Sequence, residues 1–204
     1  MTNGVLELNG LSLELLKELS FKSSLGISLK KDLRYFPKDE LLNELFSMAD
    51  WYDEKEILYE IALDYRIKSR DSIMNKYDRY FPDSQARKTF NDILGFRAFC
   101  DDYHDVLALK SEFFRLADMS CGKAHDDGYR GVHLYFQLDN SHYPIEIQYN
   151  TLYDRQLNNW LHEYVYKKGY PNTIGQELRK SYENSLIKNE KDFTEVLNNV
   201  LSGS

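Results

Sequence analysis

Four side chains suited to binding phosphate follow one another at regular spacing near residue 70. Arg66 and Lys68 are two positions apart in a strand-like run, and Ser72 and Lys76 are four apart in a helix-like run. Alternation along a strand and the 3.6-residue period of a helix would place each pair on one face. A helix start adds backbone N–H donors for an anion. The segment predicts a polyphosphate site, although a solvated basic strand edge explains it equally well.

Two acidic residues in apolar surroundings are candidates for magnesium ligands. Asp92 stands at the entrance to an apolar run, where an aspartate more often serves as a turn or cap residue. Glu146 lies between isoleucines, and a buried carboxylate is costly unless it is paired or bound to metal. Together they could hold Mg2+ while ATP phosphates and water complete its shell. Asp92 and Arg97 lie an odd number of positions apart, so a regular strand would place them on opposite faces. A shared site therefore requires that Asp92 precede the strand or that Gly95 form a bulge.

An aromatic ring and a histidine mark a third region of interest. Tyr129 and His133 have the same parity, so a regular strand would place them on one face, opposite Val132 and Leu134. A tyrosine ring beside a pocket can stack on a nucleobase, a contact worth about 1–3 kcal/mol per base. Taken singly, however, Tyr129 is better explained as a packing residue and His133 as a surface histidine.

Helices and short strands would position these residues. Apolar periodicity predicts strands over 65–68, 93–100, 132–138 and 145–149, with a turn at 139–141 between the last two. It predicts helices over 11–20, 39–60, 72–80 and 103–117, a helix that begins after 151 and runs through 160 to 166, and a final helix from about 174 toward 200. The fold class is therefore α+β. We expect one domain over 1–204, with N-terminal helices in 1–64, an α/β core in 65–167 that carries these clusters, and a C-terminal helix in 168–204.

Composition limits the function further. The chain has 204 residues, a net charge of -7 and two cysteines, which are too few for a disulfide framework. No stretch approaches the roughly 18 apolar residues of a membrane span, so we expect a cytoplasmic protein without a membrane partner. Residues 66–97 carry eight basic against four acidic side chains. A basic site on an acidic chain suits a small charged ligand or a local RNA contact.

The clusters occur in an order that resembles the synthetase domain of the RelA/SpoT family, the alarmone pyrophosphokinases. The resemblance covers about half of the chain and rests on four motifs: Arg66-x-Lys68-x-x-x-Ser72-x-x-x-Lys76, Asp92-x-x-Gly95-x-Arg97, Gly128-Tyr129-Arg130-x-x-His133 and Glu146-Ile147-Gln148. Their joint occurrence is far more specific than any one of them. The resemblance implies a nucleotidyltransferase-like fold, in which helices flank a mixed sheet of about five strands.

The resemblance also implies roles for the residues of each motif. Arg66 and Arg97 would sandwich the adenine of ATP, while Lys68, Ser72 and Lys76 would hold its phosphates. Asp92 and Glu146 would bind Mg2+, and Glu146 would help to deprotonate the attacking hydroxyl. Tyr129 would stack on the acceptor base with His133 nearby, and Arg130 and Gln148 would be further acceptor contacts. The reaction would be in-line attack on the β-phosphorus of ATP with AMP leaving.

Departures from the family pattern fall on the acceptor half. The usual apolar-Arg-Thr run after Glu-x-Gln is Tyr149-Asn150-Thr151, so a cation expected beside acceptor phosphates is missing. A Pro-Lys loop is replaced by residues 123–127, and Leu157 and Leu161-His162 replace a Trp and a Glu-His pair. This pattern resembles the toxic small alarmone synthetases, which pyrophosphorylate the 3′ end of tRNA and block aminoacylation.

The toxin hypothesis predicts a tRNA acceptor end and a cognate antitoxin as partners. Basic residues outside the pocket would grip the RNA, and the candidates are Lys30, Lys31, Arg34 and Arg115, although isolated surface charges are commonly only solvated. One alternative is a small alarmone synthetase that uses GDP or GTP. Another is a catalytically silent RNA-binding module, which would not need both Asp92 and Glu146. The sequence leaves the oligomeric state open.

Overall fold

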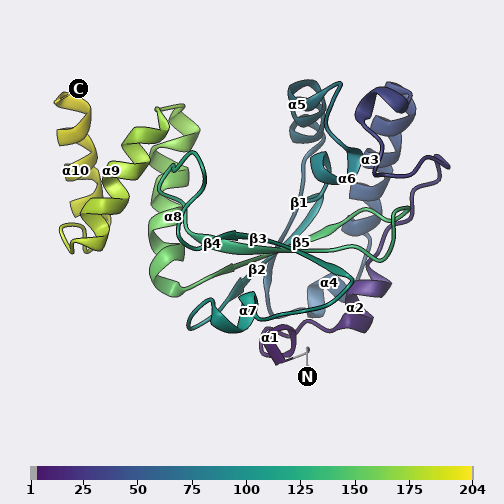
Figure 1. Ribbon diagram of the computed structural model, residues 1–204, viewed down its shortest axis with the longest axis horizontal. Coiled ribbons are helices and arrows are strands. Elements are labelled where there is room, and N and C mark those ends of the chain that lie inside the picture. Colours follow the sequence, from purple (N-terminus) through teal and green to yellow (C-terminus); the bar gives the residue numbers. More distant parts are fainter. Residues whose placement is uncertain (1–3, 204) are drawn as a thin grey trace. The chain divides into compact units, whose positions relative to one another are not determined.

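The computed structural model of the protein describes residues 4–203 (Figure 1), so the ends of the expected domain 1–204 lie outside the described residues. The described residues form two compact units. The first contains residues 4–98, 108–116 and 133–148, and the second contains residues 99–107, 117–132 and 149–203. The expected single-domain organisation stays a prediction. No helix within residues 4–203 is long and apolar enough to cross a membrane.

A five-stranded sheet confirms the expected α+β class, with helices flanking a mixed sheet. The strand order is β1-β2-β5-β4-β3, with bounds Asp64–Ile67 for β1, Leu94–Phe99 for β2, Phe114–Met119 for β3, Gly131–Phe136 for β4 and Ile145–Asn150 for β5. Strands β1 and β2 pair antiparallel, with Arg66 opposite Gly95. The four predicted strand runs are confirmed within a few residues, and β3 is the strand that the sequence pattern missed.

Alternation along the strands separates core from site in the first unit. In β2, Leu94, Phe96 and Ala98 are fully buried, whereas Gly95 and Arg97 point to the other face. The same alternation in β4 and β5 buries Leu134, Phe136, Ile145 and Ile147 in the core. The polar residues of these three strands therefore share a face, and that face carries the candidate site.

Helices of the first unit match most of the expected ones. They are α1 Gly4–Glu7, α2 Leu13–Glu18, α3 Lys38–Asp53, α4 Ile57–Glu60, α5 Arg70–Tyr80 and α6 Ala86–Thr89, with a 3-10 turn η1 at Leu33–Tyr35. The expected helix over 39–60 is broken at residues 54–56. Glu44 on α3 is buried, and its carboxylate accepts hydrogen bonds from the Ser23 and Tyr143 hydroxyl groups at 2.7 and 2.8 Å. The hydrogen bond from Ser23 connects the loop that precedes Lys30 to helix α3.

The predicted helix over 103–117 is wrong. Only His104–Leu107 is helical (α7), and the chain then turns into strand β3, which is next to β4 in the sheet. Phe113 accepts a backbone hydrogen bond from the Gln137 N–H at 2.8 Å, and the ring of Phe114 lies 5.4 Å from that of Phe136. This long-range pairing overrides a locally helical apolar pattern. Arg115 consequently lies on a strand.

The C-terminal helices of the second unit pack around one apolar cluster. They are α8 Leu152–Tyr164, α9 Asn172–Glu183 and α10 Glu190–Ser202, with a 3-10 turn η2 at Tyr166–Lys168. The prediction of one helix from 174 toward 200 is wrong, because Ser185 adopts a left-handed conformation and Asn189 caps α10. Folding back lets α9 and α10 bury Leu178, Phe193 and Leu197 with Leu157 and Leu161 of α8.

Candidate active site

The pairing of β1 with β2 brings two arginines to one face. Arg66 is opposite Gly95, and Arg97 is two positions further along β2, opposite Asp64. Cross-strand partners and residues two apart share a face, so both guanidinium groups extend from the same side of the sheet. Both side chains are exposed, and Gly95 leaves the space between them without a side chain. The arrangement suits two planar cations on either side of a flat ring.

Asp92 precedes β2, so the parity problem is solved without a bulge. Its Oδ2 accepts a hydrogen bond from Lys68 Nζ at 2.7 Å, and its Oδ1 accepts one from Lys76 Nζ at 2.8 Å. Burial raises the pKa of Asp92, but the positive charges of Lys76 and Lys68 outweigh it, and the pKa lies below its ordinary value. Asp92 is therefore an anion at neutral pH, held between two cations.

Glu146 on β5 is only 6% exposed. His133 Nδ1 lies 3.0 Å from its Oε1, and Gln148 Nε2 donates to its Oε2 at 2.7 Å. Burial raises the pKa of Glu146, whereas the hydrogen bond and charge of His133 lower it, and the net pKa is below its ordinary value. Glu146 is thus a second carboxylate of this site, more deeply buried than Asp92 and positioned by residues from two of the predicted motifs.

These residues line one cavity of about 60 Å³ in the first unit. Its walls contain both carboxylates and three of the predicted cations, and the lining residues are Arg66, Lys68, Asp92, Gly95, Arg97, Glu146 and Gln148. Lys76 reaches this cavity through its ion pair with Asp92. Ser72 lies at the start of α5, where its hydroxyl contacts the capping Ser69. The structure therefore brings together most of the predicted ATP-binding residues.

The donor groups of this cavity fit magnesium. Asp92 and Glu146 offer the hard carboxylate oxygens that Mg2+ prefers, and it commonly uses only one or two of them. Residues 4–203 contain no cluster of three or more metal-binding side chains, so substrate phosphates and water would have to complete the shell. Both carboxylates now bind protein donors, and an ion would have to displace some of them.

Tyr135 is a site residue that sequence reasoning missed. Its hydroxyl is hydrogen-bonded to Glu146 and lies 3.4 Å from His133 Nδ1, and the Arg115 guanidinium carbon lies 4.2 Å from its ring centre. Burial first, and then the charge of Glu146, raise the pKa of Tyr135, so its hydroxyl remains a donor. Strand alternation in the sequence could have identified Tyr135, because positions 133 and 135 share a face of β4.

The Tyr135→Phe variant tests this contact. The ring and its contact with Arg115 would remain, whereas one donor to Glu146 would be lost. We expect turnover to fall about tenfold, equal to ~1.4 kcal/mol for one hydrogen bond to a charged group. Nucleotide affinity, measured by equilibrium binding of ATP, should stay unchanged. The exposed Tyr35→Phe serves as the control. Equal turnover in both variants would show that the hydroxyl does not support Glu146.

A second cavity of about 310 Å³ lies in the same unit and carries three cations. Lys30, Arg87 and Arg115 line it together with Tyr135 and two acids, Glu112 and Asp139. Backbone hydrogen bonds fix its wall, since the Leu29 N–H donates to Asn140 O and the Arg87 N–H donates to Leu29 O, both at 2.9 Å. We refer to it as the cationic cavity.

Two of the four predicted RNA contacts thus meet in the cationic cavity, and Arg87 joins them. Sequence reasoning counted Arg87 only as part of a basic segment. Lys31 and Arg34 are not among its lining residues. The Lys31 ammonium lies 5.4 Å from the centre of the Tyr35 ring, and Arg34 pairs with Asp83 at the surface.

Tyr129 and Arg130 belong to the second unit. Tyr129 is partly buried, its N–H donates to Asp127 Oδ1 at 3.1 Å, and Lys123 Nζ lies 4.9 Å from its ring centre. The Arg130 guanidinium forms two hydrogen bonds with the Asp126 carboxylate, at 2.8 and 3.1 Å. Their assignment to the acceptor stays a prediction, and Arg130 would first have to exchange Asp126 for a ligand.

Residues 65–170 match the family described as "Region found in RelA / SpoT proteins". Similar solved structures include small alarmone synthetase 1 from Bacillus subtilis bound to pppGpp (20% identity, 81% of this chain and 91% of that chain, TM-score 0.46). Others are small alarmone synthetase 2 from B. subtilis (21%, 81% and 96%, 0.44) and a GTP pyrophosphokinase family protein from Streptococcus pneumoniae (20%, 81% and 90%, 0.41). No curated protein matches the sequence.

Proposed function

The chain belongs to the RelA/SpoT family, and we propose that it transfers pyrophosphate from ATP to tRNA as the toxin of a toxin–antitoxin system. Family membership supports pyrophosphate transfer as the type of reaction. The proposed acceptor is the 3′-hydroxyl of the CCA end, so that the product tRNA cannot be aminoacylated and translation stops. The observation that carries this choice of acceptor is the cationic cavity in the same unit as the two carboxylates.

The donor half of the proposal concerns ATP. Arg66 and Arg97 would enclose the adenine, because their exposed guanidinium groups extend from one face on either side of Gly95. Lys68 and Lys76, with the Ser72 hydroxyl, would bind the phosphates. Since both lysines hold Asp92 in the free protein, phosphate oxygens would replace a carboxylate as their partner.

The chemical step requires an ionised base and a positioned acceptor. Mg2+ bound by Asp92 and Glu146 would neutralise phosphate charge. The acceptor oxygen forms a bond to the β-phosphorus, the bond between this phosphorus and the oxygen it shares with the α-phosphate breaks, and AMP leaves with that oxygen. Glu146 accepts the proton of the hydroxyl, and His133 orients Glu146. Most of the rate enhancement would come from positioning and charge neutralisation.

The acceptor half of the proposal concerns RNA. Tyr129 would stack on the terminal adenine, with Gln148 and Arg130 as further contacts. The cationic cavity would bind backbone phosphates of the acceptor stem, because Lys30, Arg87 and Arg115 supply three cations near one another. Tyr135 lines this cavity and is hydrogen-bonded to Glu146, so a strand bound there would lie near the reacting hydroxyl.

The deciding experiment offers several acceptors in parallel. The protein is incubated with γ-labelled ATP and Mg2+ in the presence of deacylated tRNA, GDP or GTP. Label on tRNA alone supports the proposal. Label on GDP or GTP supports the alarmone synthetase, and transfer to none of them supports a silent RNA-binding module. Growth arrest on expression, relieved by a cognate antitoxin, would test the toxin role separately.

Neutralising the cationic cavity should weaken activity on tRNA selectively. For the double variant Lys30→Gln/Arg115→Gln, we expect KM for tRNA to rise while ATP affinity stays the same, because neither residue lines the smaller cavity. The dependence of log affinity on log salt should flatten by about 1 to 2, as about two phosphate contacts are lost.

A variant with the same charge change provides the control for this prediction. Arg79→Gln/Lys188→Gln removes two exposed cations that line neither cavity. It should leave KM for tRNA near that of the wild type. Equal weakening by both double variants would mean that net charge, and not the cationic cavity, determines RNA binding.

A further inference from the structure

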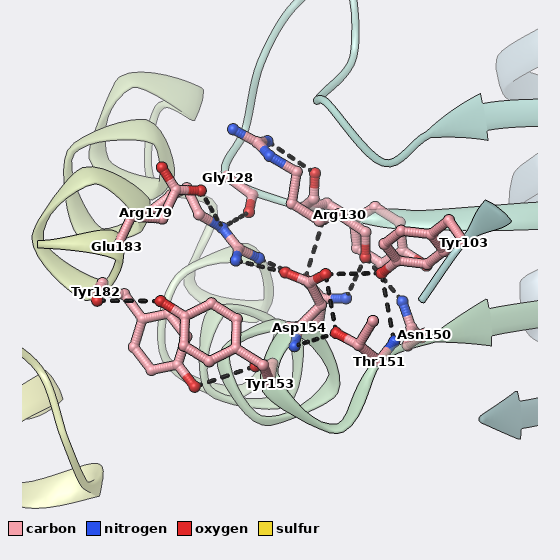
Figure 2. Close-up of polar contacts among 12 residues, drawn as sticks. Tyr103, Gly128, Arg130, Asn150, Thr151, Tyr153, Asp154, Arg179, Tyr182 and Glu183 are labelled. Atoms are coloured by element: carbon pink, nitrogen blue, oxygen red, sulfur yellow. Dashed lines mark hydrogen bonds and ion pairs between the residues drawn. The ribbon is translucent and has the colours of Figure 1, made fainter. Parts of the chain in front are cut away.

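Arg179 is the largest fully buried side chain of the described residues. It lies on α9, and Figure 2 shows its guanidinium at the centre of a polar network of the second unit. Nε donates to the Gly128 carbonyl at 2.7 Å, Nη1 to Asp154 Oδ1 at 2.7 Å and Nη2 to Asn158 Oδ1 at 3.2 Å. Such charge-assisted bonds are short and directional, so they fix the Gly128 backbone relative to α8 and α9.

Two asparagines hold Arg130, two residues further along the same loop. Asn158 on α8 accepts from the Arg130 N–H at 3.2 Å and donates through Nδ2 to the Arg130 carbonyl at 2.7 Å. Asn150 at the end of β5 donates to the same carbonyl at 2.7 Å and is 1% exposed. Asn150 occupies the position of the cation that is missing from the family pattern, and its side-chain amide donates to the loop backbone. The residues on both sides of Tyr129 are thus held by side chains (Figure 2).

The network extends from Asp154 to further residues of the second unit. The Tyr103 hydroxyl donates to Asp154 Oδ2 at 2.7 Å, and the Thr151 hydroxyl donates to it at 3.1 Å (Figure 2). Both carboxylate oxygens are therefore satisfied, and the Arg179 charge is compensated inside the unit. A fully paired network of this kind rigidifies the segments that it joins.

A close backbone contact fixes the same loop from the other side. Gly128 has φ +87°, and a Cβ on it would lie 2.2 Å from the Gly175 carbonyl oxygen. A Cβ on Gly175 would lie 2.0 Å from the Asp127 carbonyl oxygen. Only glycine fits at either position, because the atoms in the way are backbone. Helix α9 therefore packs directly against the loop backbone.

We infer that α9 positions the acceptor-binding loop, with Arg179 and Gly175 as positioning residues for the Tyr129 ring. This inference rests on the proposed function, which assigns Tyr129 to the acceptor. Helix α9 begins at Asn172, outside the residues 65–170 that match the family. Acceptor affinity in this chain thus depends on a segment that lies beyond the shared motif region, and donor affinity does not.

Two independent variants test the inference, so the test does not depend on the correct folding of a single variant. Arg179→Lys keeps the charge but cannot form the three directed bonds. Gly175→Ala keeps every polar group, and alanine normally favours a helix, so a loss would come from the contact with the loop. Leu197→Ala is the matched destabilising control, because Leu197 belongs to the apolar cluster and takes no part in the network. Lys180→Ala is the exposed control on the same helix.

The measurements are KM for the acceptor, KM for ATP, thermal stability and amide hydrogen exchange of residues 128–131. We expect both positioning variants to raise acceptor KM about tenfold, as for loss of a charge-assisted bond, with ATP KM within about twofold. Exchange of the loop amides should accelerate. Leu197→Ala should lower Tm but leave acceptor KM unchanged. The inference is overturned if the positioning variants change acceptor KM no more than Leu197→Ala does.

Failure of the proposed function gives a different result. If the wild-type protein labels GDP or GTP and not tRNA, KM for that nucleotide is the acceptor KM to compare, and if it labels neither, KM for an acceptor is undefined. Hydrogen exchange then decides whether α9 holds the loop: faster exchange in Arg179→Lys and Gly175→Ala than in Leu197→Ala supports it. Exchange equal to that of the control overturns it.

Discussion

Pyrophosphate transfer is expected to fall about a thousandfold in Asp92→Asn, equal to ~4 kcal/mol of lost transition-state stabilisation for a missing metal-ligand charge. The substitution removes little volume, so the fold should remain. It also leaves Lys68 and Lys76 without the anion that separates them. ATP should therefore bind at least as well to the variant, because the two lysines lose a competing partner. Turnover and ATP affinity, measured separately, check both expectations.

A matched control distinguishes this effect from general loss of an acid. Asp78→Asn changes an exposed aspartate on α5 that pairs with Lys38 and lines neither cavity. It should transfer pyrophosphate as well as the wild type, since exposed pairs contribute little. Wild-type turnover in Asp92→Asn would refute its assignment to magnesium, and a large drop in Tm would show a structural role.

Glu146→Gln is expected to reduce turnover by a similar factor, about a thousandfold. The amide keeps the shape of the side chain but cannot accept a proton from the attacking hydroxyl. It also cannot offer a charge to Mg2+ or to the His133 ring that now lies 3.0 Å away. Single-turnover measurement with saturating ATP isolates the chemical step, and a magnesium titration shows whether the apparent requirement for the ion rises.

Glu44→Gln provides a control of almost equal burial. Glu44 is 7% exposed, against 6% for Glu146. It is hydrogen-bonded to Ser23 and Tyr143 and does not line the smaller cavity, which contains Asp92 and Glu146. Its replacement should lower stability, because neighbouring donors lose a charged partner, but the folded fraction should remain active. If Glu146→Gln lost no more activity per folded molecule than Glu44→Gln, Glu146 would have no role in the reaction.

The sequence predicted that the side chains of the proposed donor half would lie together, for a physical reason. Its residues lie on regular elements, where alternation and helical period determine the face on which a side chain lies. Arg66, Arg97 and Glu146 could therefore be placed relative to their own strands. The position of Asp92 ahead of β2 was one of two solutions that parity allowed.

The remaining features depend on long-range contacts that no local pattern contains. Strand β3 has a helical apolar pattern, and pairing in the sheet decides its conformation. Arg87 reaches the cationic cavity because its backbone N–H donates a hydrogen bond to the carbonyl of Leu29, 58 positions earlier in the chain. Arg179 meets Gly128 across 51 positions, and nothing in the spacing of an arginine on an amphipathic helix predicts that contact. Of these missed residues, only Tyr135 could have been identified from the alternation of side chains along a strand.

The ion pairs of Asp92 have a thermodynamic consequence for the proposed ligands. In the free protein, the Asp92 carboxylate binds both ammonium groups, so the proposed ligand of Mg2+ and the proposed ligands of the triphosphate are bound to each other. A phosphate that attracted Lys68 and Lys76 would release the aspartate, and an ion that attracted the aspartate would release the lysines. Each ligand would therefore lower the cost of binding the other, and by reciprocity the two affinities would rise by the same factor.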